Sequence, residues 1–326
     1  MRLRKWWLVF VLVALSLVTV SCANEQSRAP MVPFATESIH NQRSQYTSYG
    51  DSPFVVVYVL DRATGLVVPV SVIREPSETP LEQTVRLLNA GSLPQSLRPL
   101  GASQSRIQGL TLGDSLLTVE MPPAFQSWVT RNLAEERAFV KAAALTFTSF
   151  QDIRAVQFRI NGLPMHGAVG PFQLAQTLSR PMAVNSLLAD SNSLVLYLRL
   201  RDSDLLVPWA IPSARREPAV ALHELARFRG HERLVSPVPA SLSVQSVRVE
   251  TGLAIVNLDK ASVSLFLQGT TNQQLVLDAL VYTLLEFPDI KEVLFLVDGR
   301  VLGPLGSNVD LSRPIGRTAI NRLPTP

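Results

Sequence analysis

Cysteine is nearly absent from this sequence: Cys22 is the only one among 326 residues. A chain with one thiol can form neither an internal disulfide framework nor a zinc site built from several thiolates. Lysine is almost as scarce, so that nearly all of the basic residues are arginine. Because no cluster of basic residues with interleaved aromatic residues occurs, we expect no nucleic-acid partner.

The sequence also lacks the common motifs of catalytic and cofactor sites. No G-x-S-x-G, P-loop or G-x-G-x-x-G occurs. His223 and Glu224 begin an H-E-x-x-H pattern, but the pattern fails because its last position is Arg227. A histidine on a helix surface is the simpler interpretation. We therefore expect a protein that is not an enzyme, with no catalytic residue, no metal and no cofactor.

A long hydrophobic run occurs only at the N-terminus, and it is short for a transmembrane helix. Arg2, Arg4 and Lys5 precede the apolar stretch 6–20, which falls short of the about 20 residues that span a bilayer. A positive start, an apolar stretch and a small residue before the cut are typical of an export signal. We predict a signal peptide over residues 1–21; the alternative is an uncleaved anchor.

Cys22 stands directly after this signal. Thr19-Val-Ser-Cys22 resembles the bacterial lipobox, in which a signal peptidase cuts before a cysteine that carries diacylglycerol, although the first position is usually Leu. With no second cysteine to pair with, the position favours lipidation. We predict Cys22 as a lipidation site that carries acyl chains such as palmitate, with membrane lipid on the extracytoplasmic face of the cell membrane as its partner. The alternative is a chance cysteine at the end of a signal.

Residues 22–52 are rich in Ser, Gln, Asn, Thr and Arg and show no apolar periodicity. This composition predicts a flexible tether between the lipid and a folded body. The chain as a whole is 47% hydrophobic and 17% charged, which is typical of a globular protein.

One stretch of the sequence occurs twice, in similar form. Phe150-Gln-Asp-Ile-Arg-Ala-Val-Gln-Phe-Arg-Ile-Asn-Gly162 recurs 137 positions later as Phe287-Pro-Asp-Ile-Lys-Glu-Val-Leu-Phe-Leu-Val-Asp-Gly299. Phe, Asp-Ile, a basic residue, Val, Phe and an Asn/Asp-Gly pair hold the same register throughout. Such a repeat indicates two copies of one unit.

Each copy contains the same succession of expected elements. In the first copy, two β-branched runs precede a helix whose start is marked by Thr79 as N-cap, Pro80 at the first helical position and Glu82 closing a capping box. Pro69 in the second run predicts an edge strand or a bulge. A second hairpin, a second helix and a closing strand follow, and the closing strand ends in the turn pair Asn161-Gly162.

Hairpins that alternate with helices favour an α+β fold with two tandem copies of one ββαββαβ-like module, helices packed on a mostly antiparallel sheet. The predicted boundaries are 53–166 and 194–303 for the two copies, 167–193 for a linker and 304–326 for a C-terminal tail without an obvious element.

The residues of both copies resemble the GerMN domain. The resemblance rests on the helix start Thr79-Pro80-Leu81-Glu82, a Leu-Thr-Val-Glu hairpin, and the closing stretch of the second copy from Phe287 to Gly299. Lipoproteins of sporulation and germination carry two such domains after a lipid-modified cysteine. The resemblance implies a non-catalytic extracytoplasmic lipoprotein whose fold is similar to the ring-building motifs of secretion systems.

We therefore expect a membrane-anchored scaffold or assembly component whose partners are other envelope proteins or further copies of itself. The alternative is a lipoprotein that binds or processes cell-wall glycan or a small ligand, which would need a concave polar site or two carboxylates about 5–9 Å apart. A third possibility is a protein that helps an exported enzyme to fold or localise. A buried cluster of ionisable groups shared by both copies would overturn the expected lack of catalysis.

Overall fold

The computed structural model describes residues 52–323, apart from 91–92, 101–102, 132, 182–183, 187–191, 263–271, 302–303 and 306–308. The predicted signal peptide, Cys22 and all but the last residue of the predicted tether lie outside the described residues. Across the part that is described, no helix combines the length and apolarity that a bilayer crossing requires.

The first copy begins with a hairpin of β1 (Phe54–Asp61) and β2 (Val67–Ile73), followed by helix α3 (Pro80–Ala90). Its further elements are the strand β3 (Leu97–Arg98), the single turn η1 (Ser103–Ser105), the hairpin of β4 (Gly109–Gly113) and β5 (Leu116–Glu120), the helices α4 (Ala124–Val129) and α5 (Ala134–Phe147), and the strands β6 (Ala155–Ile160) and β7 (Leu163–Pro164).

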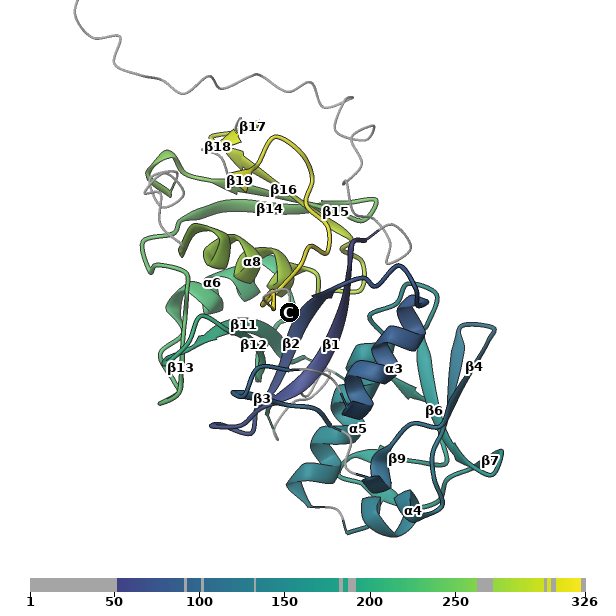
Figure 1. Ribbon diagram of the computed structural model, residues 1–326. Coiled ribbons are helices and arrows are strands. Elements are labelled where there is room, and N and C mark those ends of the chain that lie inside the picture. Colours follow the sequence, from purple (N-terminus) through teal and green to yellow (C-terminus); the bar gives the residue numbers. More distant parts are fainter. Residues whose placement is uncertain are drawn as a thin grey trace, which may run out of the picture.

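The second copy repeats this order, which confirms the prediction of two tandem modules (Figure 1). Its elements are β11 (Leu194–Leu200), β12 (Leu206–Ile211), α6 (Pro218–Arg227), β13 (Leu234–Val235), β14 (Val244–Glu250), β15 (Leu253–Leu258), α8 (Asn272–Leu284), β16 (Glu292–Val297) and β17 (Arg300–Val301).

The strands of each copy form two separate sheets, and most of the pairs are antiparallel as expected. The first copy has the orders β2-β1-β3 and β10-β6-β5-β4, in which β10 is Leu178–Ser179 and β7 also pairs with β6. The second copy has β12-β11-β13 and β14-β15-β16-β17. The pairs β5–β6 and β15–β16 are parallel, because a helical crossover connects their strands. Helices α5 and α8 each contact both sheets of their copy, so each packs between two layers.

The local signals of the sequence explain several of these elements. Glu82 accepts hydrogen bonds from the Thr79 backbone N–H (2.8 Å) and hydroxyl (2.7 Å), and the Glu82 N–H donates to the Thr79 hydroxyl (3.3 Å). This is the predicted capping box. Pro69 lies in β2, which is an edge strand. Asn161 and Gly162 have φ values of 51° and 76°, as a type I′ turn requires.

The segments expected as a plain linker and an element-free tail are structured in large part. Residues 167–181 contain β8 (Ala168–Val169), β9 (Phe172–Gln173) and β10 (Leu178–Ser179), and β10 pairs with the closing strand β6. The tail contains β18 (Pro304–Leu305) and β19 (Val309–Asp310), and Ile315 bridges to Val293 in β16. Each copy thus ends in a C-terminal extension, which pattern analysis missed because strands of two residues show no periodicity.

Candidate functional site

The two C-terminal extensions carry arginines at equivalent positions. Arg317 follows Arg180 by 137 positions, the offset of the repeat. Arg180 Nη1 donates to the Leu145 carbonyl in the last turn of α5 (3.2 Å), and Arg317 Nη2 donates to the Leu285 carbonyl just after α8 (3.3 Å). The last carbonyls of a helix lack intrahelical partners and carry partial negative charge, so a guanidinium there stabilises the helix end.

Arg180 also crosses from the first copy to the second. Its Nη2 lies 2.9 Å from Glu286 Oε1 and its Nε 3.3 Å from Glu286 Oε2, a forked ion pair. The side chains are 23% and 8% exposed, respectively. In the first copy the position of Glu286 is taken by Ser149, whose hydroxyl accepts from Arg180 Nη1 at 3.2 Å. The ion pair therefore joins the two copies on one side only.

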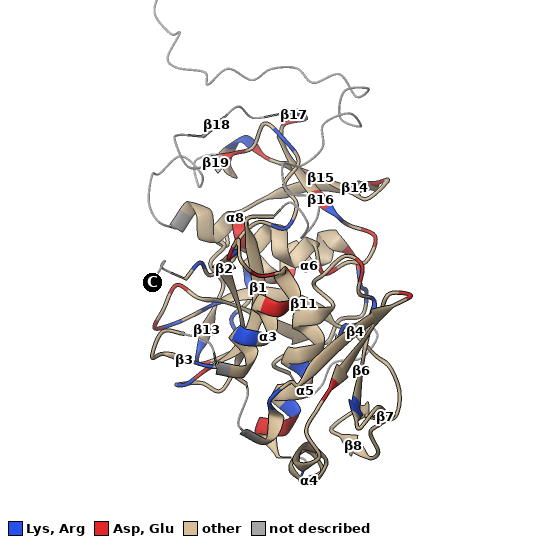
Figure 2. Cartoon of the chain, turned by 45° about the vertical axis from the view of Figure 1, so that its right-hand side comes forward, with Lys and Arg blue, Asp and Glu red and all other residues tan. Residues whose placement is uncertain are grey.

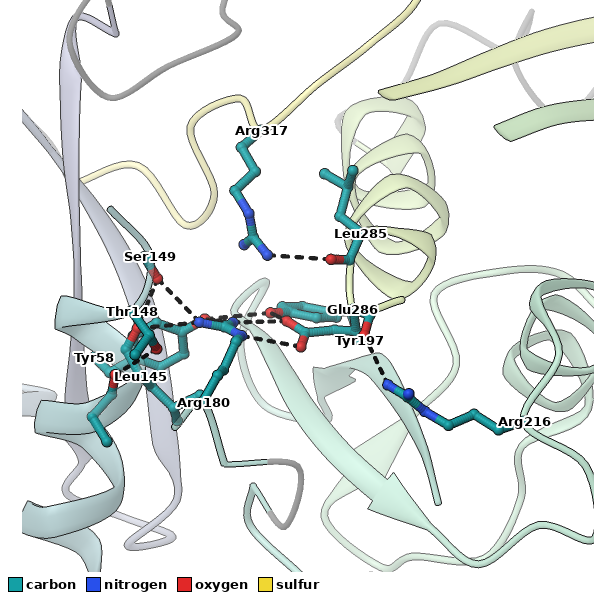
Figure 3. Close-up of polar contacts among 11 residues, drawn as sticks. Tyr58, Leu145, Thr148, Ser149, Arg180, Tyr197, Arg216, Leu285, Glu286 and Arg317 are labelled. Atoms are coloured by element: carbon teal, nitrogen blue, oxygen red, sulfur yellow. Dashed lines mark hydrogen bonds and ion pairs between the residues drawn. The ribbon is translucent and has the colours of Figure 1, made fainter. Parts of the chain in front are cut away.

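Two tyrosines from equivalent strands complete this cluster (Figure 3). Arg180 Nη2 donates to the hydroxyl of Tyr58 in β1 (3.0 Å), and the hydroxyl of Tyr197 in β11 donates to Glu286 Oε1 (2.9 Å). The two hydroxyl oxygens lie 3.5 Å apart. We call Tyr58, Arg180, Tyr197, Glu286 and Arg317 the clamp.

The electrostatics of the clamp keep its charges fixed. Burial by itself would raise the pKa of Glu286, but Arg180, then Arg317, and the hydrogen bonds from Arg180 and Tyr197 lower the pKa to about 2. Burial, followed by the neighbouring Glu286 carboxylate, raises the pKa of Tyr197 well above its usual range. At neutral pH Glu286 is therefore anionic and Tyr197 neutral.

The clamp is a buried ionisable cluster shared by both copies, the feature that was expected to overturn the lack of catalysis, so the chemistry of its groups decides the question. General acid–base catalysis needs a group whose pKa lies near the working pH and which can reach a substrate. Glu286 meets neither condition, since it stays ionised and both of its oxygens accept hydrogen bonds from within the clamp. The arrangement suits a fixed junction between the copies.

A second set of polar contacts joins the edge strands β2 and β12. Asn185 Nδ2 donates to the carbonyls of Val67 in β2 (2.8 Å) and Pro208 in β12 (2.9 Å). Asn321 Nδ2 makes the equivalent bonds with the two copies exchanged: it donates to the carbonyls of Leu206 in β12 (2.7 Å) and Pro69 in β2 (2.7 Å).

Both asparagines have positive φ, 57° and 47°, which asparagine tolerates. Each C-terminal extension thus bonds both to the second strand of its own copy and to the carbonyl of the equivalent proline, Pro208 or Pro69, in the other copy. We call these contacts the seam.

The residues considered from sequence do not gather at the clamp. Cys22 lies outside the described residues. His223 is exposed on α6, Trp128 is buried in the core of the first copy, and Trp209 is half-buried against the His231 ring at a centroid distance of 4.6 Å. Within the described ranges, no three His, Cys, Asp or Glu residues are grouped as a metal site would require.

A cavity of about 320 Å³ lies in the second copy and bears on the alternative of a glycan or ligand site. Arg201, Arg229, His231 and Ser236 line it together with apolar residues that include Phe228. No carboxylate is among the lining residues, so the cavity does not hold the pair of carboxylates that glycoside hydrolysis uses. Arg201 Nε donates to the Glu232 carbonyl (2.8 Å), which gives this arginine a structural role in the adjoining loop.

Comparison with known proteins agrees with the repeat. A family model described as Germane, sporulation and spore germination, matches residues 56–166 and 195–303. The structure resembles the tandem GerMN domains of the sporulation protein GerM from Bacillus subtilis, with a TM-score of 0.67 and 21% identity, over 82% of this chain and 99% of that chain.

The first GerMN domain of the same protein, as a separate structure, matches 39% of this chain and 98% of its own length at 18% identity and a TM-score of 0.34. No curated protein matches the chain. At this level of identity, the likeness to the tandem domains establishes the fold alone.

Proposed function

This chain belongs to the Germane family of sporulation and spore germination domains, and from this we propose that it is a non-catalytic lipoprotein that scaffolds an assembly at the extracytoplasmic face of the cell membrane. The observation that carries the proposal is the clamp. Buried ionisable groups of the clamp hold the two copies together, with Glu286 anionic and Tyr197 neutral at neutral pH. A body of two modules joined in this way presents its surfaces at a constant spacing, as a scaffold needs.

Anchoring would follow from Cys22 and the tether. Acyl chains on Cys22 would hold the chain at the membrane, since more than one chain gives stable attachment. Residues 22–52 are polar and would act as a flexible coil with an end-to-end distance of roughly 30 Å. This reach would let the two-module body meet envelope proteins, or further copies of itself, near the membrane surface. Sporulation or germination is the process that the family description supports.

The test combines fractionation with co-purification. In Cys22→Ser, lipidation is blocked, and we expect the chain to leave the membrane fraction and to lose partners that co-purify with the parent from detergent-solubilised membranes. Thr19→Leu is the matched control, because it restores the usual first residue of the lipobox and should keep the chain on the membrane. Because Cys22→Ser also blocks the cut before the lipid-modified cysteine, a variant retained with its signal uncleaved is not decisive. A parent chain that incorporates no labelled palmitate would contradict lipid anchoring and favour an uncleaved anchor. An anchored parent that co-purifies with no partner and no second copy would contradict the scaffold role.

A further inference from the structure

The two copies differ at the open edge of their larger sheets. Strand β4 ends the sheet of the first copy and β14 ends the equivalent sheet of the second, and no other described strand pairs with the outer side of either. An open edge offers unpaired backbone groups to another strand, and proteins usually guard it with charges or a bulge. Strand β14 has both guards, because it carries Arg248 and Glu250 and its register shifts between Val244 and Ser246.

Strand β4 has neither guard. Its sequence is Gly109-Leu-Thr-Leu-Gly113, without a charge (Figure 2). Its pairing with β5 is regular. Thr111 and Gly113 stand at the repeat positions of Arg248 and Glu250. Leu112 is 46% exposed, although it belongs to the apolar side of the strand, where it faces Leu117 across the sheet. The first copy therefore leaves an uncharged strand with an exposed leucine at the margin of the molecule.

This strand is also complementary to itself. Antiparallel pairing about Thr111 places Thr111 opposite its own equivalent, Leu110 opposite Leu112, and Gly109 opposite Gly113. The two leucines would extend the apolar face that already includes Leu117 and Val119, and threonine pairs across antiparallel strands are favourable. We propose that β4 binds the β4 strand of a second copy of this chain, about a twofold axis at Thr111, so that the two sheets continue into one.

The position of β4 leaves room for such a partner. The strand lies at the outer edge of the first copy, on the side away from the second copy (Figure 1). A twofold contact uses the same surface on both chains and therefore closes at a dimer, with β14 protected at the far end of each. The inference rests on the proposed scaffold function, which it deepens: chains anchored in one membrane would meet at a raised local concentration.

The first experiment uses the Cys22→Ser chain, in which Thr111→Cys is the only thiol. Residues directly opposite each other in an antiparallel pair have Cα atoms about 4.5–5.5 Å apart, which a disulfide can bridge. We expect mild oxidation to yield a disulfide-linked dimer. The matched control is Arg248→Cys at the equivalent position of β14, which should yield little disulfide-linked dimer. Equal yields at the two positions would overturn the proposal.

The second experiment measures the mass of the same Cys22→Ser chain by sedimentation. Thr111→Arg sets two like charges opposite each other and should weaken dimerisation about tenfold or more, whereas Thr111→Val keeps the shape of the strand and should preserve the dimer. A Thr111→Arg chain that still sediments as a dimer would overturn the pairing. A Cys22→Ser chain that sediments as a monomer, with β4 bound instead by a different protein, would also overturn it. Both measurements compare variants of the same Cys22→Ser chain, solubilised in detergent where an uncleaved signal keeps it in the membrane, so a failure of lipid anchoring leaves the comparison unaffected.

Discussion

Glu286 shows how one side chain joins the two copies. It is 8% exposed and faces a guanidinium that is itself 23% exposed. Removing one member of such a pair leaves the other charge desolvated, which costs more than the intact pair contributes. Ser149 stands at the repeat position of Glu286, so one carboxylate lies beside the two arginines, which also donate to carbonyls at the ends of α5 and α8.

We predict that Glu286→Gln lowers the free energy of unfolding by about 2–3 kcal/mol, because Arg180 would lose its counter-charge. Urea denaturation at pH 7 measures the change. The control is Glu78→Gln, which removes the exposed ion pair of Glu78 with Arg86 and should cost at most about 0.5 kcal/mol. The pKa of Glu286 is lowered in the folded state, so its contribution should be full above pH 4.5 and be lost as the pH falls toward 2. Equal effects of the two substitutions would contradict the role of the clamp.

Asp278 on α8 should affect stability in the opposite sense. Burial raises its pKa from 3.8 to about 7, despite a hydrogen bond from Gln274 and the nearby charge of Arg322. The folded state therefore holds a proton that the unfolded state has lost, and stability should fall as the pH rises from about 4 to 7. We predict that Asp278→Asn removes this fall and stabilises the protein at pH 8 by on the order of 2–4 kcal/mol. Thermal unfolding at a series of pH values measures the stability of parent and variant. If the two stabilities change with pH in the same way, the raised pKa of Asp278 is contradicted.

At the scale of elements, the sequence predicted what local chemistry determines. The closing strands were expected to end at the turn pairs Asn161-Gly162 and Asp298-Gly299, and β6 and β16 do. Apolar residues alternate in β6, whereas β16 is a continuous apolar run bounded by its turn. The helix beginning at Pro80 was marked by its capping box. The C-terminal extensions were missed as elements, because their strands have two residues each and are held by contacts distant in the sequence.

The clamp could not be found by spacing for the same reason. Arg180 lies 122 positions from Tyr58 and 106 from Glu286, so no local pattern brings them together. One signal was present: Arg180 and Arg317 share the offset of the repeat, in segments outside the predicted copies.

The asparagine at the end of each extension gives a prediction at this scale. Asn321→Asp keeps the shape and the tolerance of positive φ but loses the amide that donates to Leu206 and Pro69. We expect destabilisation of about 2 kcal/mol, since two carbonyls lose their donor and face a carboxylate. Asn185→Asp should cost a similar amount, because its contacts are equivalent. Chemical denaturation of both variants tests this, and a neutral Asn321→Asp would mean that the seam does not depend on these bonds.

For the whole molecule, the clamp, the seam and the continuous apolar core predict one cooperative unit. Most buried apolar residues of both copies belong to one cluster that spans the two copies. A smaller cluster in the second copy consists of Leu253, Ile255, Leu294, Leu296 and Val301. After the predicted signal, the only tryptophans are Trp128 in the first copy and Trp209 in the second. Fluorescence of Trp209→Phe and Trp128→Phe therefore reports on the first and the second copy separately. We expect each variant's fluorescence midpoint to coincide with its own midpoint by circular dichroism. Separate midpoints in either variant would mean that the copies unfold independently.

The symmetry of the seam bears on the origin of the chain. Each extension makes the same bonds to the other copy, so two unlinked polypeptides with one module apiece could make every one of these bonds as a homodimer. Gene duplication and fusion would then have converted an encounter between molecules into an internal contact. Once covalently joined, the halves were free to diverge, and a serine in one half could stand opposite a glutamate in the other.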